Sequence, residues 1–176
     1  DHARVDLTDS APLLPVARVS QRDPDWKDQL YDHTTQTIEK LGCALTSAVM
    51  MLKFHGIQEI TTGVPVNPST LNSWLNAQPD GYIASGLVNW IAITRLAYQF
   101  HLRNPQAPSL EYVRKPATEA QFQQEFMFNR PPIIELNGHF VVGAGLDMNM
   151  LTIADPYYTN RYTLALTDAK SLRTFI

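Results

Sequence analysis

The sequence predicts an α+β fold, in which a helical N-terminal half packs on an antiparallel β-sheet formed by the C-terminal half. Two observations support this prediction. Apolar residues recur mostly at helical spacing in several segments before residue 128, whereas after it the period changes toward two. Helices also precede strands along the chain instead of alternating with them, which is typical of α+β domains.

Composition places the chain among globular proteins of ordinary size. Its 176 residues are enough for one domain with a proper core, and 44% of them are hydrophobic while 18% are charged. The formal net charge of -3 shows no basic excess, so we expect no nucleic-acid partner. No run approaches the roughly 18 apolar residues that span a bilayer, so we expect no transmembrane segment. The single cysteine excludes an internal disulfide and a thiolate zinc cluster, and it leaves the redox compartment open.

The N-terminal residues divide into an arm and the start of a domain. Residues 1–20 are mixed in character and contain two prolines, so we expect an extended arm or linker there. Residues 21–176 are expected to form a single domain. Gln21 opens a loop that reaches an aromatic anchor at Trp26, and a polar segment over 34–42 follows.

Four helices are predicted, most of them with a recognisable start or end. The first is followed by Gly56, a residue suited to a helix C-cap. The second starts after Asn67, because a capping asparagine followed by a proline favours a helix start. Thr118 and Gln121 fit a capping box that opens the last helix. In chain order the predicted helices cover 43–55, 67–75, 87–98 and 118–128.

Four strands are predicted in the C-terminal half. They are separated by Asn-Gly, Asp-Met-Asn and Asp-Pro sequences, which favour tight turns. We expect the helical half and this sheet to meet in a cleft, with Cys43 on one wall and His139 on the other. The predicted strands cover 132–136, 139–144, 151–154 and 161–166.

Cys43 is the most reactive position that the sequence offers. It follows Gly42 directly and opens the first predicted helix. A thiol in the first turn of a helix lies near unpaired backbone N–H groups and the positive end of the helix dipole. Both favour the thiolate, which is the nucleophilic form of cysteine.

Three further residues supply what a nucleophilic thiol needs. His139 is a candidate base or imidazolium partner for Cys43. Asp155 follows the strand next to the one that His139 opens, and neighbouring strands commonly pair, so its carboxylate is expected to orient the ring. The backbone N–H of Cys43 and the side-chain amide of Gln21 are candidate donors to an oxyanion. Together these residues indicate a thiol hydrolase.

Each of these residues also has an ordinary structural interpretation. A lone cysteine in an apolar helix is usually a small buried side chain, a glycine–histidine pair is often a turn, and Asp-Pro often starts one. A zinc site made of Cys43, His139 and Asp155 is chemically feasible, but no short-spaced ligand pair supports it, so we expect no metal and no cofactor. Among the other histidines, His55 lies near a helix end, where a positive charge is mildly favoured.

At these residues the sequence resembles the bacterial C39-like cysteine peptidases of the papain-like clan. The resemblance runs from about Gln21 to the C-terminus. It rests on Gln21-x-Asp23-x-x-Trp26, Thr37-Ile38, Gly42-Cys43-Ala-Leu-Thr-Ser, Val66-Asn-Pro68, Leu71-Asn-x-Trp74-Leu75, Gly81-Tyr82, Gly86, Trp90, Pro132-Ile-Ile, His139-Phe-Val-Val-x-x-Gly145 and Ile153-x-Asp155-Pro156.

The resemblance implies a papain-like fold, with the nucleophile at the start of a central helix that packs on an antiparallel sheet. Cys43 would be the nucleophile and His139 the general base. Asp155 would orient the histidine, and Gln21 would complete the oxyanion hole. Many C39-like proteins stand alone outside the cytoplasm, so an extracytoplasmic or secreted location is expected.

The function expected from the sequence is a thiol-dependent hydrolase that cleaves a peptide or isopeptide amide through a Cys43 acyl-enzyme. The expected partner is a peptide or protein substrate. Two alternatives stay open. One is a non-catalytic module of the same fold that binds a peptide or a cell-wall ligand. The other is an acyltransferase or deamidase effector that uses the same residues. The natural substrate and the oligomeric state are not decided by the sequence.

Overall fold

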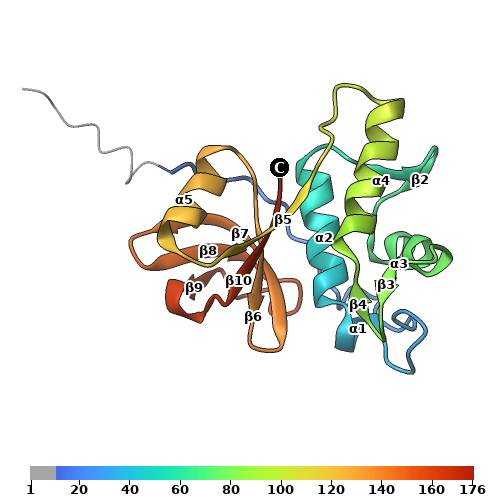
Figure 1. Ribbon diagram of the computed structural model, residues 1–176. Helices are drawn as coiled ribbons and strands as arrows, with labels where there is room; N and C mark the ends of the chain where they lie inside the picture. Colours follow the sequence, from blue (N-terminus) through green and yellow to red (C-terminus); the bar gives the residue numbers. More distant parts are fainter. Residues whose placement is uncertain (1–10) are drawn as a thin grey trace, which may run out of the picture.

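A six-stranded antiparallel sheet lies beside a group of helices in the computed structural model, which describes residues 11–176 (Figure 1). The predicted α+β class is confirmed at this level. The first ten residues of the predicted arm lie outside the described residues. None of the helices within 11–176 combines the length and the apolar character that a membrane span requires.

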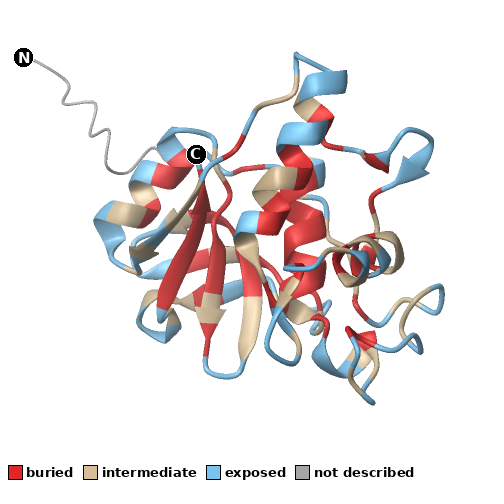
Figure 2. Ribbon diagram, turned by 45° about the vertical axis from the view of Figure 1, so that its right-hand side comes forward, coloured by how far each residue is buried: buried red, intermediate tan, exposed pale blue. Residues whose placement is uncertain are grey.

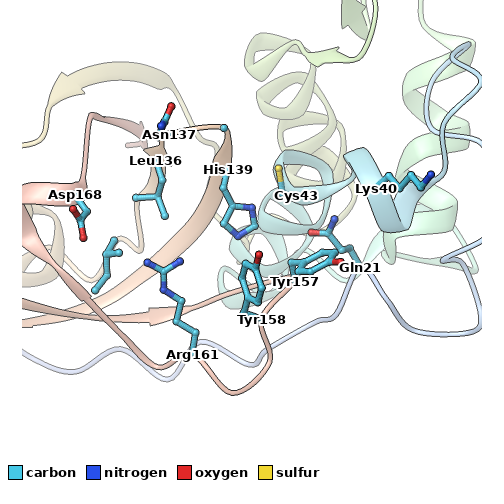
Figure 3. A pocket seen from close by; sticks show the side chains of 12 residues that line it. Gln21, Lys40, Cys43, Leu136, Asn137, His139, Tyr157, Tyr158, Arg161 and Asp168 are labelled. Atoms are coloured by element: carbon cyan, nitrogen blue, oxygen red, sulfur yellow. The ribbon is translucent and has the colours of Figure 1, made fainter.

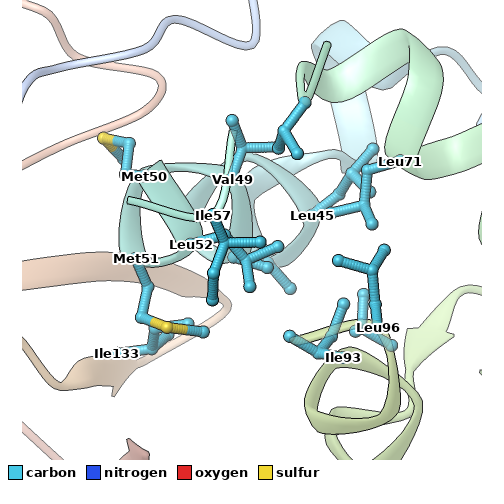
Figure 4. Close-up of a cluster of buried hydrophobic side chains, with 14 of the residues drawn as sticks. Leu45, Val49, Met50, Met51, Leu52, Ile57, Leu71, Ile93, Leu96 and Ile133 are labelled. Atoms are coloured by element: carbon cyan, nitrogen blue, oxygen red, sulfur yellow. The ribbon is translucent and has the colours of Figure 1, made fainter. Parts of the chain in front are cut away.

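The helical half is built around one buried helix. Every residue over 44–52 in the central helix α2 is buried, which leaves only its two ends near the surface (Figure 2). The side chains of this helix pack between two partners, with Leu45 next to Leu71 of α3 and Met51 next to Ile133 of the sheet (Figure 4). The helices are α1 (Ile38–Leu41), α2 (Cys43–Phe54), α3 (Pro68–Ala77), α4 (Trp90–Arg103) and α5 (Glu119–Met127).

Local capping sets most of the helix boundaries. Asn67 and Thr70 form a reciprocal capping box at the start of α3, as the asparagine predicted, and Thr118 caps α5. The prediction of a helix from residue 87 is wrong at its start. Leu87–Val88 forms strand β4, and α4 begins only after Asn89, whose side chain accepts a hydrogen bond from the N–H of Ile91. The short helix α1, capped by Thr37, was not predicted.

The large sheet runs in the order β5-β10-β6-β7-β8-β9, with every pair antiparallel. Three of the predicted strands are found, and the fourth is confined to 163–165 because a 3-10 turn follows it. The bounds are β5 (Tyr112–Pro116), β6 (Ile133–Leu136), β7 (His139–Asp147), β8 (Met150–Ala154), β9 (Thr163–Ala165) and β10 (Ser171–Phe175). Two small hairpins, β1 (Glu59–Thr61) with β2 (Val64–Pro65) and β3 (Tyr82–Ile83) with β4, lie in the helical half.

Strands β5 and β10 were not predicted because both carry charges that interrupt an apolar pattern. Strand β10 is nevertheless buried at all five positions and lies between β5 and β6. Its Arg173 is buried because it forms an ion pair with Glu135 of β6 at 2.8 Å. This neutralisation depends on strand order, which local sequence does not reveal.

The two faces of the sheet bury different sets of residues. Ile133 and Val142 face α2, whereas the adjacent Ile134 and Val141 belong to a second cluster that α5 covers. Leu14 is buried in this second cluster, and its N–H donates to the carbonyl of Ala144 at 2.7 Å. The described part of the predicted arm, 11–20, is therefore extended and anchored on the domain.

Buried charges tie α5 to the sheet behind the cleft. The carboxylate of Glu125 is fully buried and forms ion pairs with Lys115 at 2.9 Å and Arg130 at 3.0 Å. His55 lies close to this group, and the expectation of a favourable positive charge there is wrong. Burial, together with the charge of Arg130, lowers the pKa of His55 to about 4, so its ring is neutral at neutral pH.

Candidate active site

Cys43 is held at the N-terminus of α2 by the tight connection from α1. The two helices meet at Gly42, where a Cβ would lie only 2.5 Å from the carbonyl oxygen of Ile38. Only glycine fits this connection without moving the backbone. The connection leaves the Cys43 side chain partly exposed at the positive end of a twelve-residue helix.

His139 and Asp155 are brought together by the β7–β8 pair. His139 opens β7 after Gly138, whose φ of 69° favours glycine in the turn. Asp155 directly follows β8, and Val142 pairs with Ala154 across the two strands. The predicted pairing of these neighbouring strands is therefore confirmed. It places the His139 Nε2 atom 2.9 Å from Asp155 Oδ1.

The carboxylate of Asp155 is fully buried and is anchored by the backbone of the two tyrosines that follow Pro156. Its Oδ1 atom also accepts hydrogen bonds from the N–H groups of Tyr157 and Tyr158 at 2.9 and 3.0 Å. Burial alone would raise the pKa of Asp155, but the hydrogen bonds from His139 and these N–H groups outweigh it and lower that pKa below its usual value. Asp155 therefore remains an anion that orients the ring.

The ring of His139 connects Asp155 to Cys43. Since Nε2 is engaged by Asp155, Nδ1 is the nitrogen left to face the thiol, and both side chains line one groove (Figure 3). Burial opposes the charged form of His139, but the hydrogen bond to Asp155 and the neighbouring Cys43 outweigh it and raise the pKa of His139 to about 9. The ring is thus an imidazolium at neutral pH, which places a cation in the groove beside Cys43.

Gln21 also lies in this groove, but its amide is partly engaged elsewhere. Its Nε2 atom donates to the carbonyl of Glu39 at 2.7 Å and more weakly to that of Ile38 at 3.4 Å. Its Oε1 atom is buried without a hydrogen-bond partner among residues 11–176. The backbone N–H of Gln21 donates to the carbonyl of Pro156 at 2.8 Å, which fixes this loop beside Asp155.

The groove has a volume of about 590 Å³ and a wall that the sequence did not identify. Tyr157, Tyr158 and Arg161 form this wall on the loop after Asp155 (Figure 3). The guanidinium of Arg18 clamps the loop by donating to the carbonyls of Tyr158, Thr159 and Arg161. The paired tyrosines that follow Asp155-Pro156 were the one signal of this wall in the sequence.

The groove continues past Cys43 and His139 into a second pocket of about 740 Å³. Its lining is more apolar and includes Ile83, Leu87 and Phe140. Cys43 and His139 therefore lie in the middle of an extended cleft between the helices and the sheet. A peptide in extended conformation along this cleft would lie next to both the thiol of Cys43 and the imidazole of His139.

Over 11–176, no three His, Cys, Asp or Glu side chains are arranged to hold a metal ion. Neither protein-family models nor curated proteins give a match to this chain.

Proposed function

We propose that this protein is a thiol hydrolase that cleaves a peptide or isopeptide amide through a covalent acyl-enzyme on Cys43. One observation carries the proposal. His139 connects the thiol at the start of α2 to the buried carboxylate of Asp155 within an open cleft. This arrangement supplies a nucleophile, a proton carrier and an orienting group in one line.

The proposed reaction starts from the ion pair of Cys43 and His139. The sulfur attacks the carbonyl carbon, and the oxygen becomes an anion near the backbone N–H of Cys43. The amide of Gln21 supplies the second donor by exchanging its weaker Nε2 hydrogen bond, the one of 3.4 Å to the carbonyl of Ile38, for one to the oxyanion. His139 then passes the Nδ1 proton to the leaving amine, and the C–N bond breaks to leave a thioester.

Hydrolysis of the thioester completes the cycle. A water molecule gives a proton to Nδ1 of His139 while its oxygen attacks the thioester carbonyl. The C–S bond breaks, the acid leaves, and the thiolate of Cys43 re-forms beside the imidazolium. If an amine replaced water in this step, the same residues would carry out acyl transfer.

The proposal includes membership of the papain-like clan, within the C39-like peptidases. The motifs from Gln21 to Asp155 support it, as does the position of Cys43 at the start of a buried helix beside an antiparallel sheet. Under this proposal the substrate lies along the cleft, with its scissile carbonyl above Cys43.

A peptide library with mass-spectrometric detection tests the proposed reaction. We expect the wild-type protein to cleave a subset of peptides and to show a thioester adduct on Cys43, and the Cys43→Ala variant to do neither. Lys53→Ala removes an exposed side chain from the same helix and serves as the matched control. Cleavage that persists in Cys43→Ala would end the proposal. A protein that binds peptides without forming the adduct would instead be a binding module.

A further inference from the structure

The second pocket beside Cys43 has an apolar wall that is open to solvent. Ile83 and Leu87 are paired across the β3–β4 hairpin, and both line the pocket although they are 56% and 60% exposed. Single exposed apolar residues are common, but apolar side chains that gather around one pocket are typical of a binding groove. Tyr112 and Phe140 line the pocket from the sheet.

The hairpin is held in place by the helical half. The side chain of Asp32 accepts a hydrogen bond from the N–H of Gly86 at 2.9 Å, and the hydroxyl of Tyr31 donates to the carbonyl of Gly86 at 2.7 Å. Ile83 and Leu87 therefore extend from a hairpin whose base is anchored to the helical half.

The rim of the same pocket carries an excess of positive charge. Lys40, Arg114, Lys170 and Arg173 line it, whereas Glu135 is its one carboxylate among the described residues. Glu135 is already paired with Arg173. The other three cations are exposed, and within 11–176 no ion pair joins any of them to a carboxylate. This local excess contrasts with the net charge of -3 for the whole chain.

Strand pairing also indicates that the rim has an excess of positive charge, because it sets two of the cations opposite each other. Arg114 of β5 is the register partner of Arg173 of β10. Like charges directly opposite each other on neighbouring strands are destabilising. Glu135 offsets one of the two, so the sheet retains an unbalanced guanidinium at the edge of the cleft. An anion from outside the chain would balance it.

We infer that the cleft selects peptide substrates with an acidic side chain, which Arg114 and Lys170 bind while a neighbouring apolar side chain occupies the pocket between Ile83 and Phe140. This inference rests on the proposed function, since it names the substrate class of the same site. Charge complementarity at a solvent-exposed rim gives selectivity that falls as salt rises.

Binding to the non-reacting Cys43→Ala protein tests the inference without requiring turnover. The probes are rhodamine-labelled octapeptides of alanine that contain one phenylalanine at a fixed position. One of the remaining alanines at a time is replaced by glutamate, glutamine or lysine. Fluorescence anisotropy gives the dissociation constants. We expect the best glutamate peptide to bind roughly 3- to 10-fold more tightly than its glutamine counterpart, because two exposed ion pairs contribute about this factor. Added salt should remove the difference.

Matched variants separate the rim from general charge effects. Arg114→Gln combined with Lys170→Gln should abolish the preference for glutamate, and both residues are exposed, so the fold should be retained. Arg103→Gln removes an exposed cation at the far end of α4 and should leave the preference intact. Equal binding of glutamate and glutamine peptides, no binding at millimolar peptide, or a preference that survives the double variant would overturn the inference.

The outcome is distinguishable from failure of the proposed reaction. A glutamate preference in Cys43→Ala, together with no thioester adduct in the wild type, would support the acidic-peptide site and end the hydrolase proposal. A thioester adduct in the wild type without a glutamate preference in Cys43→Ala would support the hydrolase proposal and end the acidic-peptide site.

Discussion

Replacing Asp155 with asparagine tests the chemical core of the proposal. Asparagine keeps an oxygen that can accept the hydrogen bonds from the Tyr157 and Tyr158 N–H groups, but it removes the negative charge beside His139. Burial lowers the pKa of His139, and Asp155 is among the groups that outweigh it. We therefore expect the His139 pKa to fall from about 9 toward or below its ordinary value of 6.5.

The size of the effect follows from the two pKa values. At pH 7.5 a group with a pKa of 9 is about 97% protonated, whereas one with a pKa of 6.5 is only about 9% protonated. The share of protein with an imidazolium beside Cys43 thus falls about tenfold. Because this cation stabilises the reactive thiolate, alkylation of Cys43 by iodoacetamide at pH 7.5 should slow about tenfold. Above roughly pH 9.5, where thiols ionise without help, the two proteins should converge.

Two measurements check this prediction. Intact-mass kinetics give the alkylation rate of Cys43 across pH, and NMR titration of ¹³C-labelled histidine gives the pKa of His139, assigned with His139→Gln. Thermal unfolding controls for the fold of the Asp155→Asn variant. Equal alkylation rates at pH 7.5, or a wild-type His139 that titrates near 6.5, would show that Asp155 does not hold the ring of His139 as an imidazolium.

Three further predictions address the oxyanion donor, the acid response and the buried ion pairs. Gln21→Ala should lower kcat on a cleaved peptide about 100-fold while leaving iodoacetamide alkylation of Cys43 unchanged, since alkylation forms no oxyanion; an equal loss in both assays would indicate a structural role. His55 has a folded pKa lowered to about 4, so the unfolded chain alone binds its proton between pH 6.5 and 4, and stability is lost as pH falls through this window. In urea unfolding, the free energy of unfolding of His55→Gln should fall by up to about 3 kcal/mol less than that of the wild type over that pH range, and an equal fall in the two proteins would contradict this. Glu125→Gln should reduce the free energy of unfolding by about 3 kcal/mol because it leaves two part-buried cations unpaired, whereas Glu119→Gln, an exposed change on the same helix, should have little effect.

The local parts of the candidate site follow from short stretches of sequence. Gly42 before an apolar helical pattern predicts the place of Cys43. Turn residues between two strands predict that His139 and Asp155 meet, because neighbouring strands pair with little loss of chain entropy. The orientation of the Gln21 side chain could not be predicted from the sequence. Its amide nitrogen binds the backbone of α1, a helix too short to show a hydrophobic period.

Most of what surrounds these residues depends on contacts between distant segments. Arg18 clamps a loop about 140 residues further along the chain, and Arg114 meets Arg173 only because β10 inserts between β5 and β6. Neither contact leaves a periodic signal in its own segment. The wall of the groove and the charge of its rim were therefore visible only in the folded chain.

The longer helices, the strands around His139 and the reactive groups could be predicted from the sequence: helices before strands, a cysteine at a helix start, and a histidine and an aspartate at the ends of two paired strands. Hydrophobic period, caps and turns act over a few residues, so they can be read without a structure. The order of the strands, the lining of the cleft and the charges without an ion-pair partner became known from the folded chain alone. Those properties arise from packing between segments far apart in sequence, where burial and ion pairing depend on the whole fold.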